Sequence, residues 1–139
     1  MDLILASQSA TRRRILNSAR ISAQFMSPQI DEENITKSLI AEQALPRDIA
    51  DTLAEHKALK ISRKNPDIWV IGCDQILVFE GEIFGKPASP EALKISLSRL
   101  SGKTHRLITA NVIYKDSKPQ WRHISISHMS MRFMSAAEI

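Results

Sequence analysis

The sequence predicts a mixed α/β fold in which helices flank a twisted sheet. Strand-like and helical segments alternate along most of the chain, and two long strand-like segments follow one another near its end. The apolar run at 69–79 is typical of a strand covered on both faces. With 139 residues, 43% of them hydrophobic, the chain suits a single domain with a hydrophobic core.

The first half of the chain contains two expected strands and three expected helices. In order, these are a strand at 2–6, a helix from Ser9 through Ala19, a strand at 23–27, an acidic loop at 31–33, a helix near 36–43 and a longer helix from Pro46 to about Arg63. Ser9 is a good N-cap, and proline is favoured in the first turn of a helix.

The second half is expected to be richer in strands. In order, the sequence predicts a turn at 65–67, a strand at 69–79, a hairpin turn at 80–82 that returns through 83–84, a helix from Ser89 to about Leu100 and two strands at 104–115 and 120–133, joined by a turn at 116–119. Ile124 and Ile126 alternate with polar residues, so the last strand should be half exposed.

Asp74 is the residue in the 69–79 run that calls for an explanation. A buried carboxylate is costly unless a cation, a metal or a polar opening lies beside it, so Asp74 is a candidate site residue. The alternative interpretation is that Gly72 and Asp74 form a turn between two short strands.

Composition limits the class of protein. The single cysteine, Cys73, cannot form an intrachain disulfide, which suits a reducing compartment, and the chain begins without a recognisable signal peptide. A cytoplasmic protein without a membrane partner is therefore expected, since no apolar run reaches membrane-spanning length. The net charge of +4 includes basic clusters, at 12–14 and 57–64, that suit phosphates, although each could be a solvated helix face.

The loop at 7–11 has the arrangement that binds anions. A strand precedes it and a helix start follows, which exposes unpaired backbone N–H groups. Ser7 can add a hydroxyl donor, while Arg12 and Arg13 lie in the first turns of the helix. The loop has no Walker-type glycine pattern. Ser9 could be only a cap and the arginines only surface charge.

Two lysines are candidate phosphate ligands. Lys57 shares a helical stripe with apolar residues at 49, 53 and 61. On such a stripe it can either snorkel to the edge or deliver its ammonium into a cleft. Lys86 follows the predicted hairpin, in a Gly-Lys-Pro turn that should hold it rigidly.

Glu32 and Asp74 form a candidate pair of oxygen ligands for a hard divalent cation. The histidines lack metal-ligand spacing, and Cys73 has no evident catalytic partner, so these residues are interpreted as structural or surface residues.

Six segments of the chain form an ordered set: Leu5-Ala-Ser-Gln-Ser-Ala-Thr-Arg-Arg13, Asp31-Glu32, Leu53-Ala-Glu-His-Lys-Ala58, Gly72-Cys-Asp-Gln75, Gly85-Lys-Pro87 and Leu100-Ser-Gly-Lys-Thr-His105. Their order and spacing resemble the signature blocks of the Maf family of house-cleaning nucleoside triphosphate pyrophosphatases. The resemblance implies hydrolysis between the α- and β-phosphates. It also implies catalytic roles for Asp74, Lys57 and Lys86, substrate binding by Ser7, Arg12, Arg13 and Gln75, and Mg²⁺ or Mn²⁺ on Asp74 and Glu32.

Departures from the family's commonest pattern indicate a substrate subgroup and a domain that is incomplete at its C-terminus. Ala10 replaces the usual proline, the arginines begin one place later, and Gln75 replaces threonine. In this the chain resembles the subgroup that acts on 7-methylguanosine triphosphate; the alternative is the uridine and thymidine triphosphate subgroup. Family members continue beyond the position of Ile139, so the resemblance implies a single Maf-like domain, 1–139, that is incomplete at its C-terminus, with a helix beginning at 135–139.

Two rival functions remain at this point. A basic nucleic-acid-binding module explains the charge but not Asp74, and aromatic residues make up only 5% of the chain, so nucleic acid is not the expected partner. The second rival function is that of a catalytically weak remnant that binds nucleotides. The expected partners are a nucleoside triphosphate and a second copy of the chain.

Overall fold

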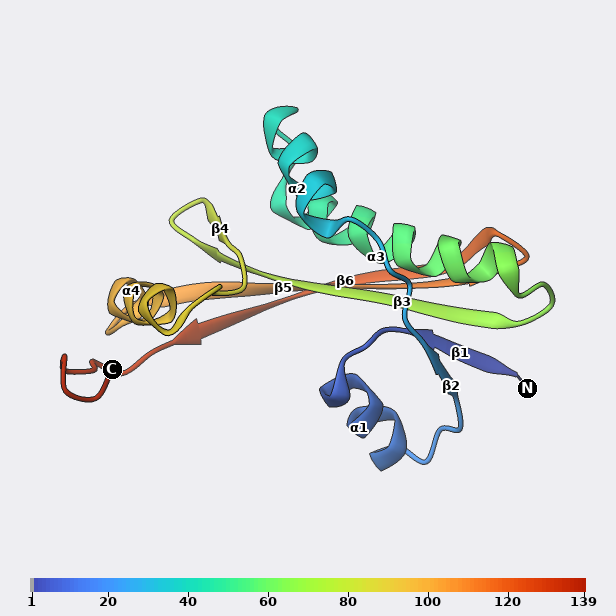
Figure 1. Ribbon diagram of the computed structural model, residues 1–139, viewed down its shortest axis with the longest axis horizontal. Helices are drawn as coiled ribbons and strands as arrows, with labels where there is room; N and C mark the ends of the chain where they lie inside the picture. The colour runs from blue at the N-terminus through green and yellow to red at the C-terminus, as the bar shows by residue number, and fades with distance from the viewer. Residues whose placement is uncertain (1) are drawn as a thin grey trace.

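A six-stranded mixed sheet organises the protein, whose computed structural model describes residues 2–139 (Figure 1). The elements in chain order are β1 (Leu3–Ala6), α1 (Ala10–Ser18), β2 (Gln24–Met26), α2 (Glu32–Ala41), α3 (Pro46–Lys64), β3 (Trp69–Phe79), β4 (Glu82–Phe84), α4 (Pro90–Leu100), β5 (Thr104–Lys115) and β6 (Lys118–Ser130). The mixed α/β class expected from the sequence is confirmed.

The strand order is β2-β1-β3-β5-β6, and the short β4 pairs with one end of β3. β1 runs parallel to both β2 and β3, whereas the β3–β4, β3–β5 and β5–β6 pairs are antiparallel. The chain therefore leaves β1 in one direction to reach β2 and later returns to pair β3 on the other side of β1. Because parallel crossovers are right-handed, the connecting helices must lie on opposite faces of the sheet. Figure 1 shows α1 on one face and α3 on the other.

Helix α3 covers the central strands and forms the core with them. Its buried side includes Ile49, Leu53, Lys57 and Ile61, the stripe that the sequence predicted. Small residues on the same side bring the helix close to the sheet, where Gly72 faces Ala54 and Ala58. The apolar side chains beneath the helix come from β1, β3 and β5: Ile4, Ala6, Val70, Ile76, Val78, Ile108, Ala110, Val112 and Tyr114. Burying each large aliphatic side chain stabilises the fold by about 1.5–3 kcal/mol.

Strand β3 is continuous from Trp69 to Phe79 and pairs with β5 along nine residues, from Val70 to Val78. The alternative of a turn at Gly72 and Asp74 is therefore wrong. Since side chains alternate across a strand, Asp74 points to the α3 face and Gln75 to the opposite face.

Several elements differ from those expected. The last strand, expected at 120–133 and half exposed, is β6 at Lys118–Ser130, in which only Ile124 is partly buried. The residues at 32–33 belong to α2, because Asp31 caps that helix by accepting from the backbone N–H of Asn34 at 3.2 Å and acidic side chains suit a helix N-terminus. The turn before β6 comprises only two residues, Asp116 and Ser117, both with positive φ, the geometry that joins tight hairpins. Residues 136–138 form a turn, not the helix expected there.

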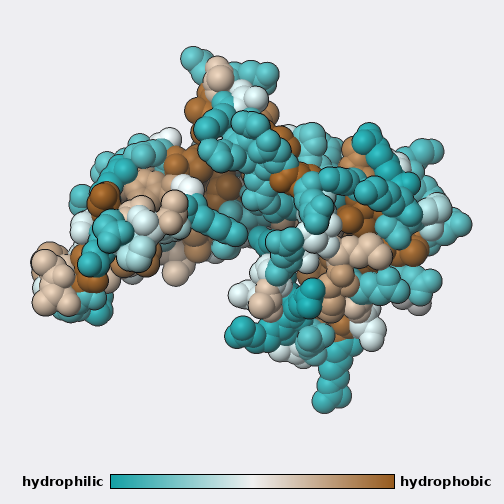
Figure 2. Space-filling view, viewed as in Figure 1, coloured by the Kyte–Doolittle hydropathy of each residue, from teal (hydrophilic) through white to brown (hydrophobic). Residues whose placement is uncertain are grey.

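Polar and apolar surfaces are unevenly distributed over the molecule. In the view of Figure 2, hydrophilic side chains cover α1 and much of the α3 side, while apolar and polar side chains mix at the end that carries α4. Exposed apolar side chains at 93, 95 and 133 belong to that end. None of the helices within residues 2–139 has the length and apolar character that crossing a membrane requires.

Candidate functional site

A cavity opens where β1 and β2 end, between helices on opposite faces of the sheet. In open α/β sheets, the place where the strand order reverses leaves such a crevice at the carboxyl ends of the strands. The cavity has a volume of about 590 Å³. It is lined by the β1–α1 loop, the β2–α2 loop and single residues from α1, α2, α3 and the segment after β4: Ser7, Gln8, Ser9, Arg12, Ser27, Pro28, Gln29, Ile30, Glu32, Lys57 and Lys86.

The loop after β1 and the first turn of α1 line this cavity with hydroxyl groups and a guanidinium. The Ser7 side chain is buried, and its Oγ accepts from the backbone N–H of Ser9 at 3.0 Å and from Arg12 Nη1 at 3.5 Å. Both contacts use acceptor capacity, so the hydroxyl hydrogen can still be donated to a ligand. Ser9 caps α1 through the backbone N–H of Arg12 at 3.2 Å, as expected, and also lines the cavity. Donor groups of this kind at a helix N-terminus are suited to binding an anion.

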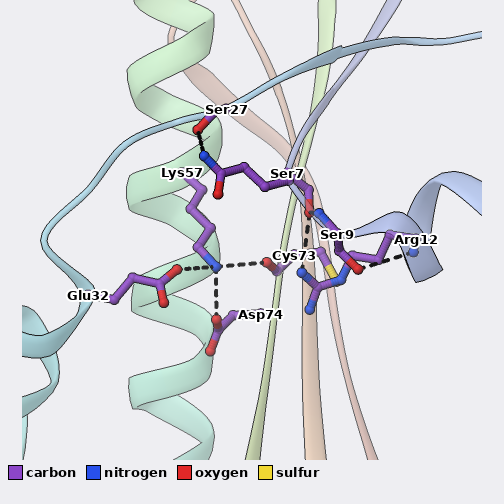
Figure 3. Close-up of polar contacts among 9 residues, drawn as sticks. Ser7, Ser9, Arg12, Ser27, Glu32, Lys57, Cys73 and Asp74 are labelled. Atoms are coloured by element: carbon purple, nitrogen blue, oxygen red, sulfur yellow. Dashed lines mark hydrogen bonds and ion pairs between the residues drawn. The ribbon is translucent and has the colours of Figure 1, made fainter. Parts of the chain in front are cut away.

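Lys57 connects two acidic residues from other elements (Figure 3). Its Nζ lies 3.0 Å from Asp74 Oδ1 on β3 and 2.6 Å from Glu32 Oε1 on α2. Lys57 and Asp74 are both only 7% exposed, whereas Glu32 is exposed. Lys57 thus does not snorkel out to the edge of the helix; it delivers its ammonium to the carboxylates at the cavity wall.

Two opposing effects act on the pKa of the Asp74 carboxyl. Burial raises its pKa above the ordinary value for aspartate, and the adjacent Lys57 ammonium opposes that rise by favouring the charged form. Its second oxygen, Oδ2, is buried and has no hydrogen-bond partner among residues 2–139. An unsatisfied buried oxygen next to a polar cavity is suited to binding a proton, a water molecule or a metal ion.

The donor set fits a divalent cation that is shared with a ligand. Within the described part of the chain, no group of three His, Cys, Asp or Glu side chains could hold a metal ion unaided. The carboxylates of Glu32 and Asp74 nevertheless both lie within hydrogen-bonding distance of Lys57 Nζ. The second oxygen of Asp74, Oδ2, has no hydrogen-bond partner among residues 2–139. Mg²⁺ commonly binds through one or two carboxylates and completes its coordination with water and substrate phosphates.

Two of the residues predicted to bind substrate lie away from the cavity. The Arg13 guanidinium lies 4.7 Å from the centre of the Phe25 ring on β2. Arg13 therefore packs α1 against β2 and does not line the cavity. Gln75 is exposed on the opposite face of the sheet, where its Nε2 donates to Thr109 Oγ1 at 3.0 Å. The other predicted residues, Ser7, Arg12, Glu32, Lys57, Asp74 and Lys86, lie at the cavity or in direct contact with a residue that lines it.

Sequence reasoning missed the uncharged wall of the cavity. Gln8 Nε2 donates to Ser27 Oγ at 2.5 Å and so joins the loops after β1 and β2. Gln29 lies beside them with a positive φ of 44°, and its carbonyl oxygen accepts from Lys60. The available signal was that Ser27 lies at the end of the expected strand at 23–27. β2 runs parallel to β1, and parallel neighbours end at the same edge of the sheet.

Comparisons with known proteins show which family the chain belongs to. The family model described as Maf-like protein matches residues 2–139. The chain belongs to the Maf-like family. The family inferred from six sequence blocks is thereby confirmed.

This Maf-like chain has relatives of similar sequence. It is 47% identical over 135 residues to a nucleoside triphosphate pyrophosphatase of Ruegeria pomeroyi, an alignment that covers 97% of the chain and 68% of that protein. It is 46% identical over 139 residues to a 7-methyl-GTP pyrophosphatase of Brucella abortus, covering the whole chain and 70% of that protein. A HAM1 protein from Coxiella burnetii shares the fold, with a TM-score of 0.52 at 12% identity over 94% of this chain and 72% of that one.

Proposed function

We propose that this Maf-like protein hydrolyses the bond between the α- and β-phosphates of nucleoside triphosphates, releasing a nucleoside monophosphate and pyrophosphate. The observation that carries the proposal is the buried Lys57–Asp74 pair beside a cavity that also contains a helix N-terminus. A triphosphate needs cations and N–H donors, and its hydrolysis needs a group that activates water. The relatives from Ruegeria pomeroyi and Brucella abortus, named as pyrophosphatases, support the same reaction.

The cationic side of the cavity is suited to the phosphates. Arg12, Lys57 and Lys86 all line it, and charge-assisted contacts from these groups would offset the negative charge on the triphosphate and on the leaving pyrophosphate. The Ser7 hydroxyl and the amides at the start of α1 would add neutral donors. Interactions of this kind accelerate hydrolysis when they strengthen as charge develops on the leaving group.

Asp74 is the residue that we propose activates water. As a carboxylate whose pKa is raised by burial, it can accept the proton of an attacking water molecule. When bound by Asp74 and Glu32, Mg²⁺ or Mn²⁺ would clamp phosphate oxygens and lower the pKa of water. The cytoplasm is the compartment that we propose, because its reducing conditions suit the unpaired thiol of Cys73.

The reaction is tested by measuring pyrophosphate release from a panel of standard and methylated nucleoside triphosphates with Mg²⁺ or Mn²⁺ present. Monophosphate and pyrophosphate should appear in equal amounts. Release of inorganic phosphate with a nucleoside diphosphate would contradict the α–β position of cleavage. Binding without any hydrolysis would instead favour the nucleotide-binding remnant.

We further propose that 7-methylguanosine triphosphate is preferred over uridine or thymidine triphosphate. Asp74-Gln75 and the displaced arginine pair support this choice, together with 46% identity to the Brucella abortus relative. Because Gln75 lies on the opposite face of the sheet, it would influence the substrate only through the packing around it. Comparing kcat/KM for the three substrates tests the preference, and faster turnover of either pyrimidine nucleotide would assign the chain to the other subgroup.

Replacing Lys86 with alanine should weaken nucleotide binding by about tenfold to a hundredfold. Loss of a hydrogen bond to a charged group costs about 1.5–3 kcal/mol, and Lys86 lines the cavity from the segment after β4. Titration of a non-hydrolysable triphosphate analogue measures the change. Lys94→Ala removes the same charge from the exposed surface of α4 and is the matched control. Equal nucleotide affinities for the two variants would show that Lys86 does not bind the nucleotide.

A further inference from the structure

The ammonium group of Lys57 lies where the two candidate metal-binding carboxylates converge. It is within 3.0 Å of one oxygen of each, and it also donates to the backbone carbonyl oxygen of Cys73 at 3.5 Å (Figure 3). Three successive elements of the chain, α2, α3 and β3, place these groups together. The position that suits a divalent cation is thus already taken by a cation that belongs to the chain.

This arrangement opposes metal binding before nucleotide binding. A divalent ion next to the ammonium would be repelled strongly, because both charges lie in a part of the protein that is shielded from water. Displacing Lys57 without giving it a new partner would leave a buried positive charge unpaired, which is also costly. A triphosphate removes both obstacles, since Lys57 lines the cavity and phosphate oxygens entering it can replace the carboxylates as its partners.

We propose that Lys57 keeps the divalent-cation position closed until a nucleotide binds, so that the metal enters with the nucleotide and not before it. This inference rests on the proposed function, because it requires a phosphate-bearing ligand in the cavity. When Lys57 turns to phosphate, Glu32 and Asp74 become available together. Asp74 also offers Oδ2, which has no hydrogen-bond partner among residues 2–139, while Lys57 contacts Oδ1.

The test is a titration with Mn²⁺ in the absence of nucleotide, followed by electron paramagnetic resonance of the unbound ion. Lys57→Met keeps the length of the side chain without its charge, and we expect it to bind Mn²⁺ at least about tenfold more tightly than the unmodified protein, a coupling of ordinary size. Lys64→Met removes a charge from the exposed end of the same helix and should leave Mn²⁺ affinity unchanged. Equal affinities for the unmodified protein and Lys57→Met, or an equal gain in Lys64→Met, would overturn the proposal.

Adding Asp74→Asn to Lys57→Met tests whether the additional Mn²⁺ binds at Asp74. The gain should disappear, and a gain that persists would place the metal elsewhere and refute the proposal. Should Lys57→Met fail to fold, the unmodified protein alone can test the proposal. Tight Mn²⁺ binding without nucleotide, if Asp74→Asn abolishes it, would contradict a closed site. Weak Mn²⁺ binding without nucleotide would support one. Because metal binding is read directly, failure to hydrolyse nucleotides would not be confused with failure of this inference.

Discussion

Replacing Asp74 with asparagine is expected to lower kcat/KM for nucleoside triphosphates by about a hundredfold to ten-thousandfold, the range that general acid–base catalysis contributes. Asparagine keeps the volume of the side chain but can neither accept a proton from water nor offer a charged ligand to a hard cation. The protein should remain folded, because Lys57 keeps Glu32 as a partner at 2.6 Å. Steady-state kinetics and circular dichroism on the same preparation measure both effects.

Asp67→Asn is the matched control for this substitution. It makes the same change of one carboxyl to an amide at an exposed turn, where φ is positive and asparagine is well tolerated. Its kinetics should equal those of the unmodified protein. A folded Asp74→Asn protein with full activity would show that another group activates water, and the assignment of Asp74 would then be wrong.

Replacing Gly72 with alanine is expected to lower the free energy of unfolding by about 1–3 kcal/mol or more, because the interior at this point is already filled. A Cβ atom on Gly72 would lie 2.2 Å from the carbonyl oxygen of Ala54 and 2.7 Å from the Cβ of Ala58. The backbone of α3 cannot avoid this contact by a side-chain rotation, so the helix must move away from β3.

The same substitution should also impair catalysis. Lys57 lies on α3 between Ala54 and Ala58, and Asp74 lies two residues after Gly72 on β3, so a shift of the helix changes the distance between their charged groups. A displacement of about 1 Å at a catalytic group can reduce turnover about a hundredfold. Urea denaturation and kcat measurement on one protein sample would quantify both losses.

Gly85→Ala provides the comparison for stability. No atom of residues 2–139, beyond its chain neighbours, lies within 4 Å of the position of an added Cβ, and φ at Gly85 is not positive. Its unfolding midpoint should therefore stay close to that of the unmodified protein. Unchanged stability in Gly72→Ala would mean that α3 and β3 lie farther apart than the 2.2 Å contact with Ala54 requires.

Local patterns in the sequence were enough to predict most of the elements. The stripe at 49, 53, 57 and 61 repeats with the period of a helix, and the long apolar run required a buried strand. Element ends were predicted less well, because caps and turns depend on single contacts. The N-cap contact of Asp31 with Asn34 begins α2 earlier than composition suggests, and two residues with positive φ make the hairpin before β6 tighter.

The sequence alone determined which residue types are available for the chemistry: one aspartate in an apolar strand, one lysine on an apolar helical stripe and a serine-rich loop before a helix. Only the tertiary structure decided which of them meet. The strand-order reversal at β1 brings Ser7, Glu32, Lys57 and Lys86 around one cavity, whereas the alternation of side chains along β3 separates Gln75 from Asp74. Distances between residues far apart in sequence depend on how helices and strands pack, because packing is a property of the whole chain and not of any one segment.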